Sequence, residues 1–234
     1  GFFVARAGLG ASESMRSKLA EYNDPRLSRA FITKQGASGK EQAPGTADNA
    51  VYAPNGTPEQ GTSKYGTSLF MYSISAPTLL LSYHELKFLE AEALCRLERD
   101  AKSALKDAVV AGLLNAENSF TISRKELGKT LINAASSITE AEAESYFDNT
   151  IEAKYTAEPL KTTMIQKYFA LWGASGEATE SYNDVRRMKG LGENFIELKN
   201  PNSFPLRCPY GNSDTTTNAE VKAAYGNGQY VYSE

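Results

Sequence analysis

The sequence predicts an all-α protein with long irregular loops. Three observations support this prediction: two amphipathic stretches between Ser82 and Leu114, a helix with a broad apolar face that begins at Pro159, and a helical segment over Glu177–Met188. The chain has 234 residues, of which 41% are hydrophobic and 23% charged, so it can bury a sizeable core. We treat residues 1–234 as a single domain, within which residues 36–72 form a long loop.

The stretch from Ser82 to Leu114 predicts two helices joined at Arg99-Asp100. Apolar residues recur at three- and four-residue spacing in both halves, which indicates one buried face per helix. In the first half these are Leu86, Leu89, Ala93, Leu94 and Leu97, with Glu85, Lys87, Glu92 and Arg96 largely on the other side. In the second half they are Ala101, Ala104, Leu105, Ala108 and Leu113, and Asp100 is the expected N-cap. This is an antiparallel hairpin of tetratricopeptide type, which is usually scaffold.

The segments before this hairpin are a short helix and a loop. Met15, Leu19 and Tyr22 can share a helix face, and Asn23-Asp24-Pro25 ends that helix because the residue before proline disfavours helical geometry. Phe31-Ile32 predicts a short extended or helical piece.

The segments after the hairpin predict further helices. Phe120–Lys125 is expected to be a connector, and Thr139 with Glu142 fits a capping box for a helix that runs to about Phe147 or on toward Tyr155. Pro159 suits the first turn of the next helix. Its buried face is expected to contain Leu160, Met164, Ile165, Tyr168, Phe169 and Trp172. The tail after Gly192 predicts at most one short helix, around Glu220–Tyr225.

The long loop is the candidate ligand face. From Gly36 to Thr67 the sequence is rich in Gly, Ser, Thr, Pro and Asn, and structureless loops beyond about 15 residues are often functional. Tyr52, Tyr65 and Tyr72 offer aromatic faces on which sugar rings stack, or they pack on their own scaffold. The hydroxyl partners would be Asp48, Asn49 and Asn55, which could also supply oxygen ligands to calcium.

The charge of the chain disfavours nucleic-acid binding, whereas its cysteine content excludes no class of protein. The formal charge is -3, and we find no basic stripe with interleaved aromatics, so nucleic-acid binding is not expected. Cys95 and Cys208 lie in different contexts, and a disulfide between them stays open. We find no signal peptide and no apolar run of membrane-spanning length.

The residues predict that the protein is not an enzyme. His84 is the only histidine, and a histidine at a helix start is more often a capping or packing residue than a base. We find no nucleophile elbow, phosphate-binding glycine loop or zinc-ligand cluster, and we predict no cofactor. Glycoside hydrolysis by two carboxylates stays open as an alternative, because 28 Asp and Glu residues supply many pairs.

Four segments, in order, resemble the SusD/RagB-like family of outer-membrane lipoproteins. They are NDPRL at 23–27, YHELKFLEAEALCR at 83–96 followed by Asp100, IQKYFALWGASGEATESYNDVRRM at 165–188, and FPLRCPYGNSDTTTN at 204–218. Members are usually about twice as long, and the resemblance covers their C-terminal half. We therefore expect a truncated or proteolysed product, in which the lipid anchor that would hold the full protein at the cell surface is absent.

The resemblance implies a cell-surface oligosaccharide-binding subunit that caps a SusC-like TonB-dependent transporter. It implies tetratricopeptide-like hairpins as a scaffold that faces the transporter, and irregular loops as the ligand face. Glycan-contacting residues have no shared motif in this family, so the assignment of the six loop residues to a binding site rests on loop chemistry alone. A protein-interaction scaffold is the alternative function.

Overall fold

The computed structural model describes residues 10–34, 41–42, 52–55, 65–73, 75–127, 136–199 and 205–232. Its internal contacts divide the chain into two compact units, Gly1–Leu198 and Lys199–Glu234. The described part is mostly helical, which confirms the predicted fold class.

The first unit contains helices and one small sheet. Its elements are α2 (Glu13–Glu21), η1 (Pro25–Ser28), β1 (Phe31–Lys34), β2 (Glu41–Gln42), β3 (Thr67–Ser68), η3 (Leu69–Tyr72), α3 (Tyr83–Arg96), α4 (Lys102–Leu127), α5 (Glu140–Tyr146), η4 (Phe147–Ile151), α6 (Glu152–Ala157), α7 (Pro159–Leu171), η5 (Ser175–Thr179) and α8 (Glu180–Gly190). The sheet has the order β2-β1-β3, with both pairings antiparallel. The extended alternative for Phe31-Ile32 is therefore the observed one.

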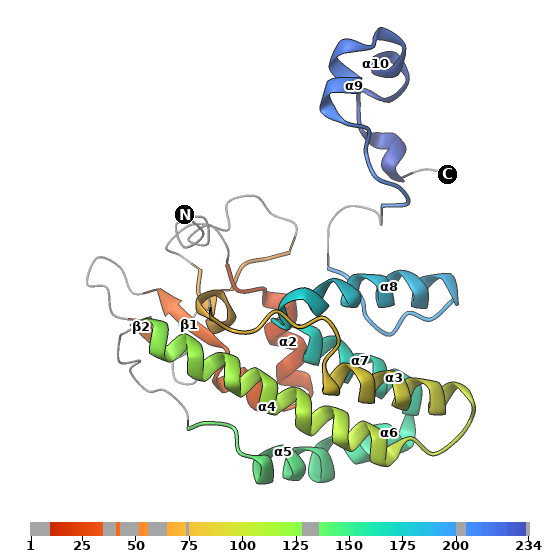
Figure 1. The fold of residues 1–234 in the computed structure, drawn as a ribbon. Coiled ribbons are helices and arrows are strands. Elements are labelled where there is room, and N and C mark those ends of the chain that lie inside the picture. The colour runs from red at the N-terminus through yellow and green to blue at the C-terminus, as the bar shows by residue number, and fades with distance from the viewer. Residues whose placement is uncertain are drawn as a thin grey trace. The chain divides into compact units, whose positions relative to one another are not determined.

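The predicted helical hairpin is present as α3 and α4, which lie side by side (Figure 1). The Ser82 hydroxyl accepts a hydrogen bond from the backbone N–H of Glu85 at 3.1 Å, and the Asp100 carboxylate accepts one from Lys102 at 3.0 Å. The predicted connector at Phe120–Lys125 is wrong, because α4 continues to Leu127. Phe120 and Ser123 extend its buried face, and the Ser123 hydroxyl donates to the carbonyls of Ser119 and Leu69.

The predicted buried face of α3 is also wrong. The side chains that are buried are His84, Glu85, Phe88, Ala91 and Glu92, whereas Leu86, Leu89 and Leu97 are 51%, 42% and 64% exposed. The buried side faces α4 and α7. The buried face predicted for α4 is correct, since Ala101, Ala104, Leu105, Ala108 and Leu113 are all buried.

The centre of the unit is α7, which begins at Pro159 as predicted. Nine of its side chains are buried: Thr162, Thr163, Met164, Ile165, Gln166, Lys167, Phe169, Ala170 and Leu171. A Cβ atom on Gly112 of α4 would lie 3.0 Å from the Ala170 Cβ, so the glycine permits this close helix contact. The buried Lys167 ammonium pairs with Asp184 of α8 at 2.8 Å.

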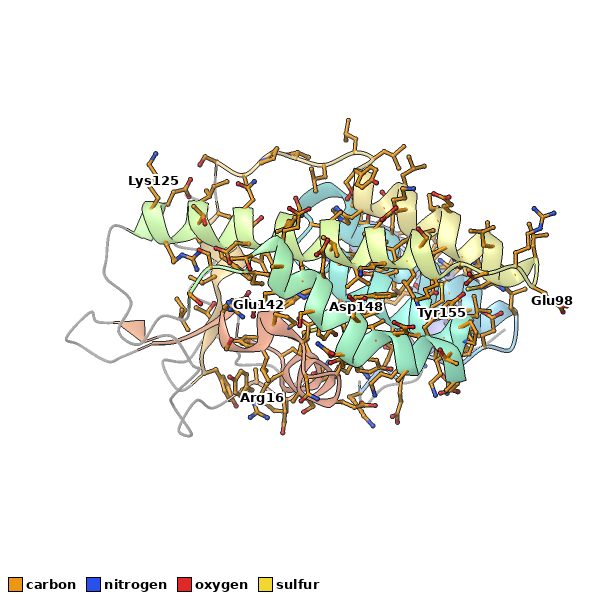
Figure 2. All side chains as sticks on the ribbon, turned by 90° about the horizontal axis from the view of Figure 1, so that it is seen from below. Arg16, Glu98, Lys125, Glu142, Asp148 and Tyr155 are labelled. Carbon is orange, nitrogen blue, oxygen red and sulfur yellow. The ribbon has the colours of Figure 1, made fainter. Side chains whose placement is uncertain are left out.

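The segment α5–η4–α6 lies along α4 (Figure 2), which confirms the helix predicted to continue toward Tyr155. Thr139 caps α5 by accepting from Glu142 N–H at 3.2 Å, while the Glu142 carboxylate pairs with Arg29 at 2.9 Å. At the other end the Tyr155 hydroxyl accepts from Ala101 N–H at 2.7 Å, which fixes α6 against the start of α4.

The second unit contains α9 (Asn212–Thr217), α10 (Ala219–Tyr225) and η6 (Gln229–Tyr232). The prediction of at most one short helix is wrong, because Asn218 separately caps α10 through its side-chain oxygen. The Arg207 guanidinium lies 4.9 Å from the ring centre of Tyr210 and 5.3 Å from that of Tyr230. These cation–π contacts hold the small unit together.

A buried ion pair at the start of η1 is bonded to α7. The Asp24 carboxylate accepts from the Arg26 side chain at 2.6 and 2.8 Å, and both residues are at most 3% exposed. Arg26 also donates to the Phe169 carbonyl at 2.8 Å.

We predict that Arg26→Ala lowers the free energy of unfolding by about 3–5 kcal/mol, because it leaves the buried Asp24 carboxylate without its cation. Urea denaturation of the variant would measure this loss. The control is Arg99→Ala, which removes an exposed arginine. An equal effect of both substitutions would contradict the assigned role.

A second buried cluster joins α3 to η5. Glu177 accepts from the backbone N–H of Ser82, and its other oxygen lies 3.5 Å from the His84 Nε2 atom. Burial, together with the hydrogen bond and like charge of Glu177, raises the pKa of Glu85 to about 7. Burial likewise lowers the pKa of His84.

We predict that Glu85 makes stability fall as pH rises from about 4.5 to about 7. In this range the folded protein holds a proton on Glu85 that the unfolded chain releases, so rising pH favours unfolding. The measurement is the free energy of unfolding against pH for the wild type and Glu85→Gln, whose difference isolates this group from His84. An unchanged pH profile in Glu85→Gln, similar to that of the exposed control Glu140→Gln, would contradict it.

Candidate functional site

The structure brings three of the six sequence-predicted site residues to one place. Residues 52–55 and 65–66 both flank the start of α2: Ala53 N–H donates to the Ala11 carbonyl at 2.8 Å, and Ala11 N–H donates to the Gly66 carbonyl at 2.8 Å. Tyr52, Asn55 and Tyr65 therefore belong to neighbouring segments. Tyr72 ends η3, and its side chain lies outside the described part, as do Asp48 and Asn49 entirely.

Several side chains on this surface already make contacts within the protein. The half-buried Tyr52 ring packs edge-on against Phe31, with 5.3 Å between ring centres, and the Arg16 guanidinium lies 5.2 Å from the Tyr52 ring centre. The Asn55 side-chain oxygen accepts from the Ser12 hydroxyl at 2.9 Å. A ligand at this surface would meet the half-buried Tyr52 ring and an Asn55 amide whose oxygen already accepts a hydrogen bond.

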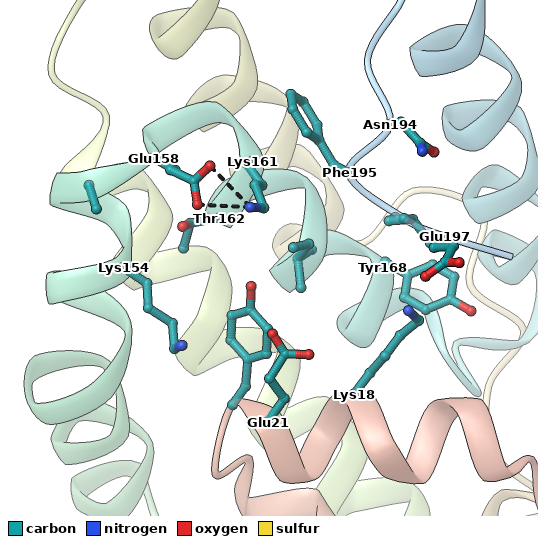
Figure 3. Close-up of a pocket in the computed structure, with 14 residues that line it drawn as sticks. Lys18, Glu21, Lys154, Glu158, Lys161, Thr162, Tyr168, Asn194, Phe195 and Glu197 are labelled. Carbon is teal, nitrogen blue, oxygen red and sulfur yellow. Dashed lines mark hydrogen bonds and ion pairs between the residues drawn. The ribbon is translucent and has the colours of Figure 1, made fainter. Parts of the chain in front are cut away.

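A separate pocket of about 410 Å³ lies between α2, α6, α7 and the segment after α8 (Figure 3). This volume is within the range of small-ligand sites. Figure 3 shows Lys154, Glu158 and Lys161 on one side and Tyr168 and Glu197 on the other. The full lining is Lys18, Glu21, Tyr22, Lys154, Ala157, Glu158, Lys161, Thr162, Ile165, Tyr168, Asn194, Phe195, Ile196 and Glu197.

Three aromatic rings line this pocket. Tyr22, at the end of α2, is held by an edge-on contact with Phe169 at 5.4 Å between ring centres. Tyr168 projects from α7 and is half-buried, and Phe195 is half-buried in the segment after α8. Because Tyr22 and Tyr168 stand on helices that pack on the core, their positions are fixed by the fold.

Charged groups of both signs surround the rings. The Lys154 ammonium lies 4.5 Å from the Tyr22 ring centre, and Lys161 donates to both oxygens of Glu158 at 2.8 and 3.0 Å. Burial, followed by the negative charges of Glu21 and Glu158, raises the pKa of Tyr22 to about 12. At neutral pH the Tyr22 hydroxyl is therefore a hydrogen-bond donor as well as an acceptor.

This combination suits a polar ligand with apolar ring faces. The half-buried Tyr168 and Phe195 rings can stack on such faces, while lysine donors and glutamate acceptors can bond hydroxyl groups. A second hollow of about 490 Å³ lies beside Asn23, Arg29 and Tyr146. Its only aromatic lining is Tyr146, which is buried, so it has no half-buried ring comparable with Tyr168 or Phe195.

Sequence reasoning missed the pocket because its lining comes from three segments that are far apart in the sequence, residues 18–22, 154–168 and 194–197. Tyr22 and Tyr168 were expected to be core positions on amphipathic helices; Tyr22 is buried as expected, whereas Tyr168 is half-buried. A signal was present in the flanking residues: Lys18 and Glu21 lie one turn or less from Tyr22, and Lys161 and Thr162 lie within two turns of Tyr168. Polar neighbours of this kind indicate the rim of a core, where a side chain is partly accessible.

The remaining candidates are packing groups. His84 is 3% exposed, and Cys95 contacts the Thr163 hydroxyl at 3.6 Å. Cys95, in the first unit, and Cys208, in the second, are both free cysteines in this structure. Within the described ranges, no group of three His, Cys, Asp or Glu side chains is arranged to hold a metal ion. The described helices include none that is both long and apolar enough to cross a bilayer.

Comparison with known protein families gives a match to the SusD-like family, described as starch-binding and associating with the outer membrane, over residues 3–210. The chain belongs to this family. It is 62% identical to a solved SusD/RagB family protein from Bacteroides thetaiotaomicron, with a TM-score of 0.88. The alignment covers all of this chain and 50% of that one. A search of curated proteins found no match.

Two more distant solved structures share the fold. An outer-membrane protein of Bacteroides vulgatus assigned to nutrient binding is 20% identical, with a TM-score of 0.57 over 94% of this chain and 48% of that one. A SusD homologue of Bacteroides fragilis is 18% identical, with a TM-score of 0.59 over 95% and 50%. This chain thus spans about half the length of these SusD-like relatives. The predicted family, fold class and outer-membrane association are confirmed.

Proposed function

We propose that this SusD-like chain is part of a non-catalytic nutrient-binding subunit at the outer membrane, and that its ligand is an oligosaccharide. The observation that carries the proposal is the family match over residues 3–210, because that family is described by starch binding and outer-membrane association. The B. vulgatus relative assigned to nutrient binding supports the same proposal.

The proposed partner is a SusC-like TonB-dependent transporter. The α3–α4 hairpin supports this proposal because paired helices are rigid scaffolds for protein contacts. Pull-down of a purified transporter tests it independently of any sugar. A transporter encoded beside this chain and not retained by it would contradict the partnership.

Two surfaces are proposed for the sugar. The first is the ring-lined pocket between α2, α6 and α7, supported by its size and its mixture of aromatic and charged groups. The second is the loop surface predicted from the sequence, with Tyr52, Tyr65 and Tyr72 as stacking groups and Asp48, Asn49 and Asn55 as hydroxyl partners. Ring stacking adds roughly 0.5–1.5 kcal/mol per aromatic contact, so either surface should bind weakly.

We predict that Tyr168→Leu and Phe195→Leu each weaken binding of a maltooligosaccharide about 2- to 12-fold. Leucine keeps apolar bulk but removes the flat ring, and the stated range follows from the stacking energy. Isothermal titration calorimetry measures the affinities, and an assay for new reducing ends in the same samples should stay negative. The control is Tyr182→Leu on the exposed part of α8.

If the pocket variants bind like the control while the wild type binds the sugar, the pocket is not the sugar site. If the wild type binds no sugar from a broad panel, the proposed ligand class is wrong. Release of reducing ends would instead favour the glycosidase alternative.

We predict that Tyr52→Leu weakens the same interaction about 2- to 12-fold if the sugar lies on the loop surface, because leucine keeps apolar bulk beside Phe31 but removes the flat ring. Titration of Tyr52→Leu alongside Tyr168→Leu compares the two surfaces directly. Loss of affinity in only one variant assigns the sugar to that surface. An unchanged affinity for Tyr52→Leu contradicts the loop assignment.

A further inference from the structure

One side of α3 is an exposed apolar stripe, which we call the leucine face. It consists of Leu86, Leu89 and Leu97, with the exposed Ala93 among them and Tyr83 at its start. At 3.6 residues per turn these positions lie on one side of the helix, opposite Phe88 and Ala91. The preceding residues Leu80 and Leu81 extend the apolar surface and are 89% and 64% exposed.

The opposite side of α3 makes this exposure unusual. Its buried side includes two carboxyl residues, Glu85 and Glu92, at 6% and 5% exposure. Glu92 is held by Arg187 of α8 at 2.8 Å and by Arg96 at 2.7 Å. Although burial opposes ionisation, these bonds lower the pKa of Glu92. The helix therefore buries paired charges and exposes leucines. Turning the leucine face inward would break the pairs that Glu92 makes with Arg187 and Arg96.

The charged groups around the stripe leave its leucines exposed, although the Lys87 ammonium lies over the Tyr83 ring, 5.8 Å from the ring centre. Lys87 pairs with Glu90 at 3.0 Å and with Asp107 of α4 at 3.5 Å, along the flank nearer to α4. A large apolar surface bounded by polar residues on a helix marks a contact with another protein segment. Tetratricopeptide-type hairpins bury such faces against neighbouring repeats.

The solved B. thetaiotaomicron relative indicates which segment is available. At 62% identity it contains this whole fold, and it contains an equal length of chain outside the matched region. We propose that the leucine face is the contact surface for that second half of a full-length SusD-like polypeptide. Covalent connection would give the contact a high effective concentration, which a separate partner lacks.

This assignment leaves another surface for the transporter. Ser103, Asn118, Thr121 and Lys125 are exposed on α4, so the outer side of that helix is polar. The leucine face would then be internal to the complete protein, and the outer side of α4 would remain accessible.

Cysteine accessibility tests the proposal. Leu86→Cys and Leu89→Cys are made in this chain and in a chimera that joins it to the unmatched half of the B. thetaiotaomicron relative, in the order of that relative. Reaction with a maleimide is followed by peptide mass spectrometry, which separates the new cysteines from Cys95 and Cys208. We expect both positions to react at least tenfold more slowly in the chimera. Leu191→Cys, at an exposed position after α8, should react at the same rate in both proteins.

Cysteines at the two aligned positions of the intact relative give a second measurement that does not depend on folding of the chimera. Equal rates at the leucine face in the isolated chain and in the intact relative overturn the proposal. It is also overturned if Leu191→Cys is slowed as much as Leu86→Cys. Slowing of Leu86→Cys with rising concentration of the isolated chain would assign the face to a second copy, and slowing only on addition of the transporter would assign it to that partner.

Discussion

Burial of α7 on nearly every side is the constraint on which the first unit depends. A helix in that position must find partners for its polar groups, because an unpaired buried charge is strongly unfavourable. Lys167 therefore requires Asp184, which fixes α8, and the Phe169 carbonyl receives Arg26, which fixes the turn after α2. Gly112 allows α4 to approach Ala170 closely. The neighbouring helices are thus placed by α7 through specific pairs as well as by apolar contact.

The candidate pocket lies along one side of α7, on which Tyr168 is half-buried whereas Thr162 and Ile165 are buried. Thr162, Ile165 and Tyr168 recur at three-residue spacing and face α2 and α6 across the pocket. Because most of the lining stands on packed helices, the pocket is preformed and its rings lose little conformational freedom when a ligand binds. The loop surface around Tyr52 differs in this respect, since its order comes from a few backbone hydrogen bonds to residues 11–13.

Local signals in the sequence predicted the elements well and their contacts less well. Four helices begin where expected, because capping depends on neighbours within one turn. Their starts are marked by Ser82, Asp100, Thr139 and Pro159. Periodicity failed for α3 because its buried side has only two apolar residues, Phe88 and Ala91, which were outnumbered by the leucines on the exposed side. The pocket could not be predicted, since only the tertiary fold brings Lys18 and Glu197 to the same cavity.

The orientation of α3 follows from comparing the two faces it could bury. Burying a leucine is worth roughly 1.5–3 kcal/mol, so turning the leucine face inward would gain several such terms. It would also break the pairs that Glu92 makes with Arg187 and Arg96, and breaking a buried pair by removing one partner costs about 3–5 kcal/mol. Phe88 and Ala91 would leave the core as well. The observed orientation keeps both the charge pairs and the burial of Phe88, and it leaves the leucines available for an interface on the exposed side of α3.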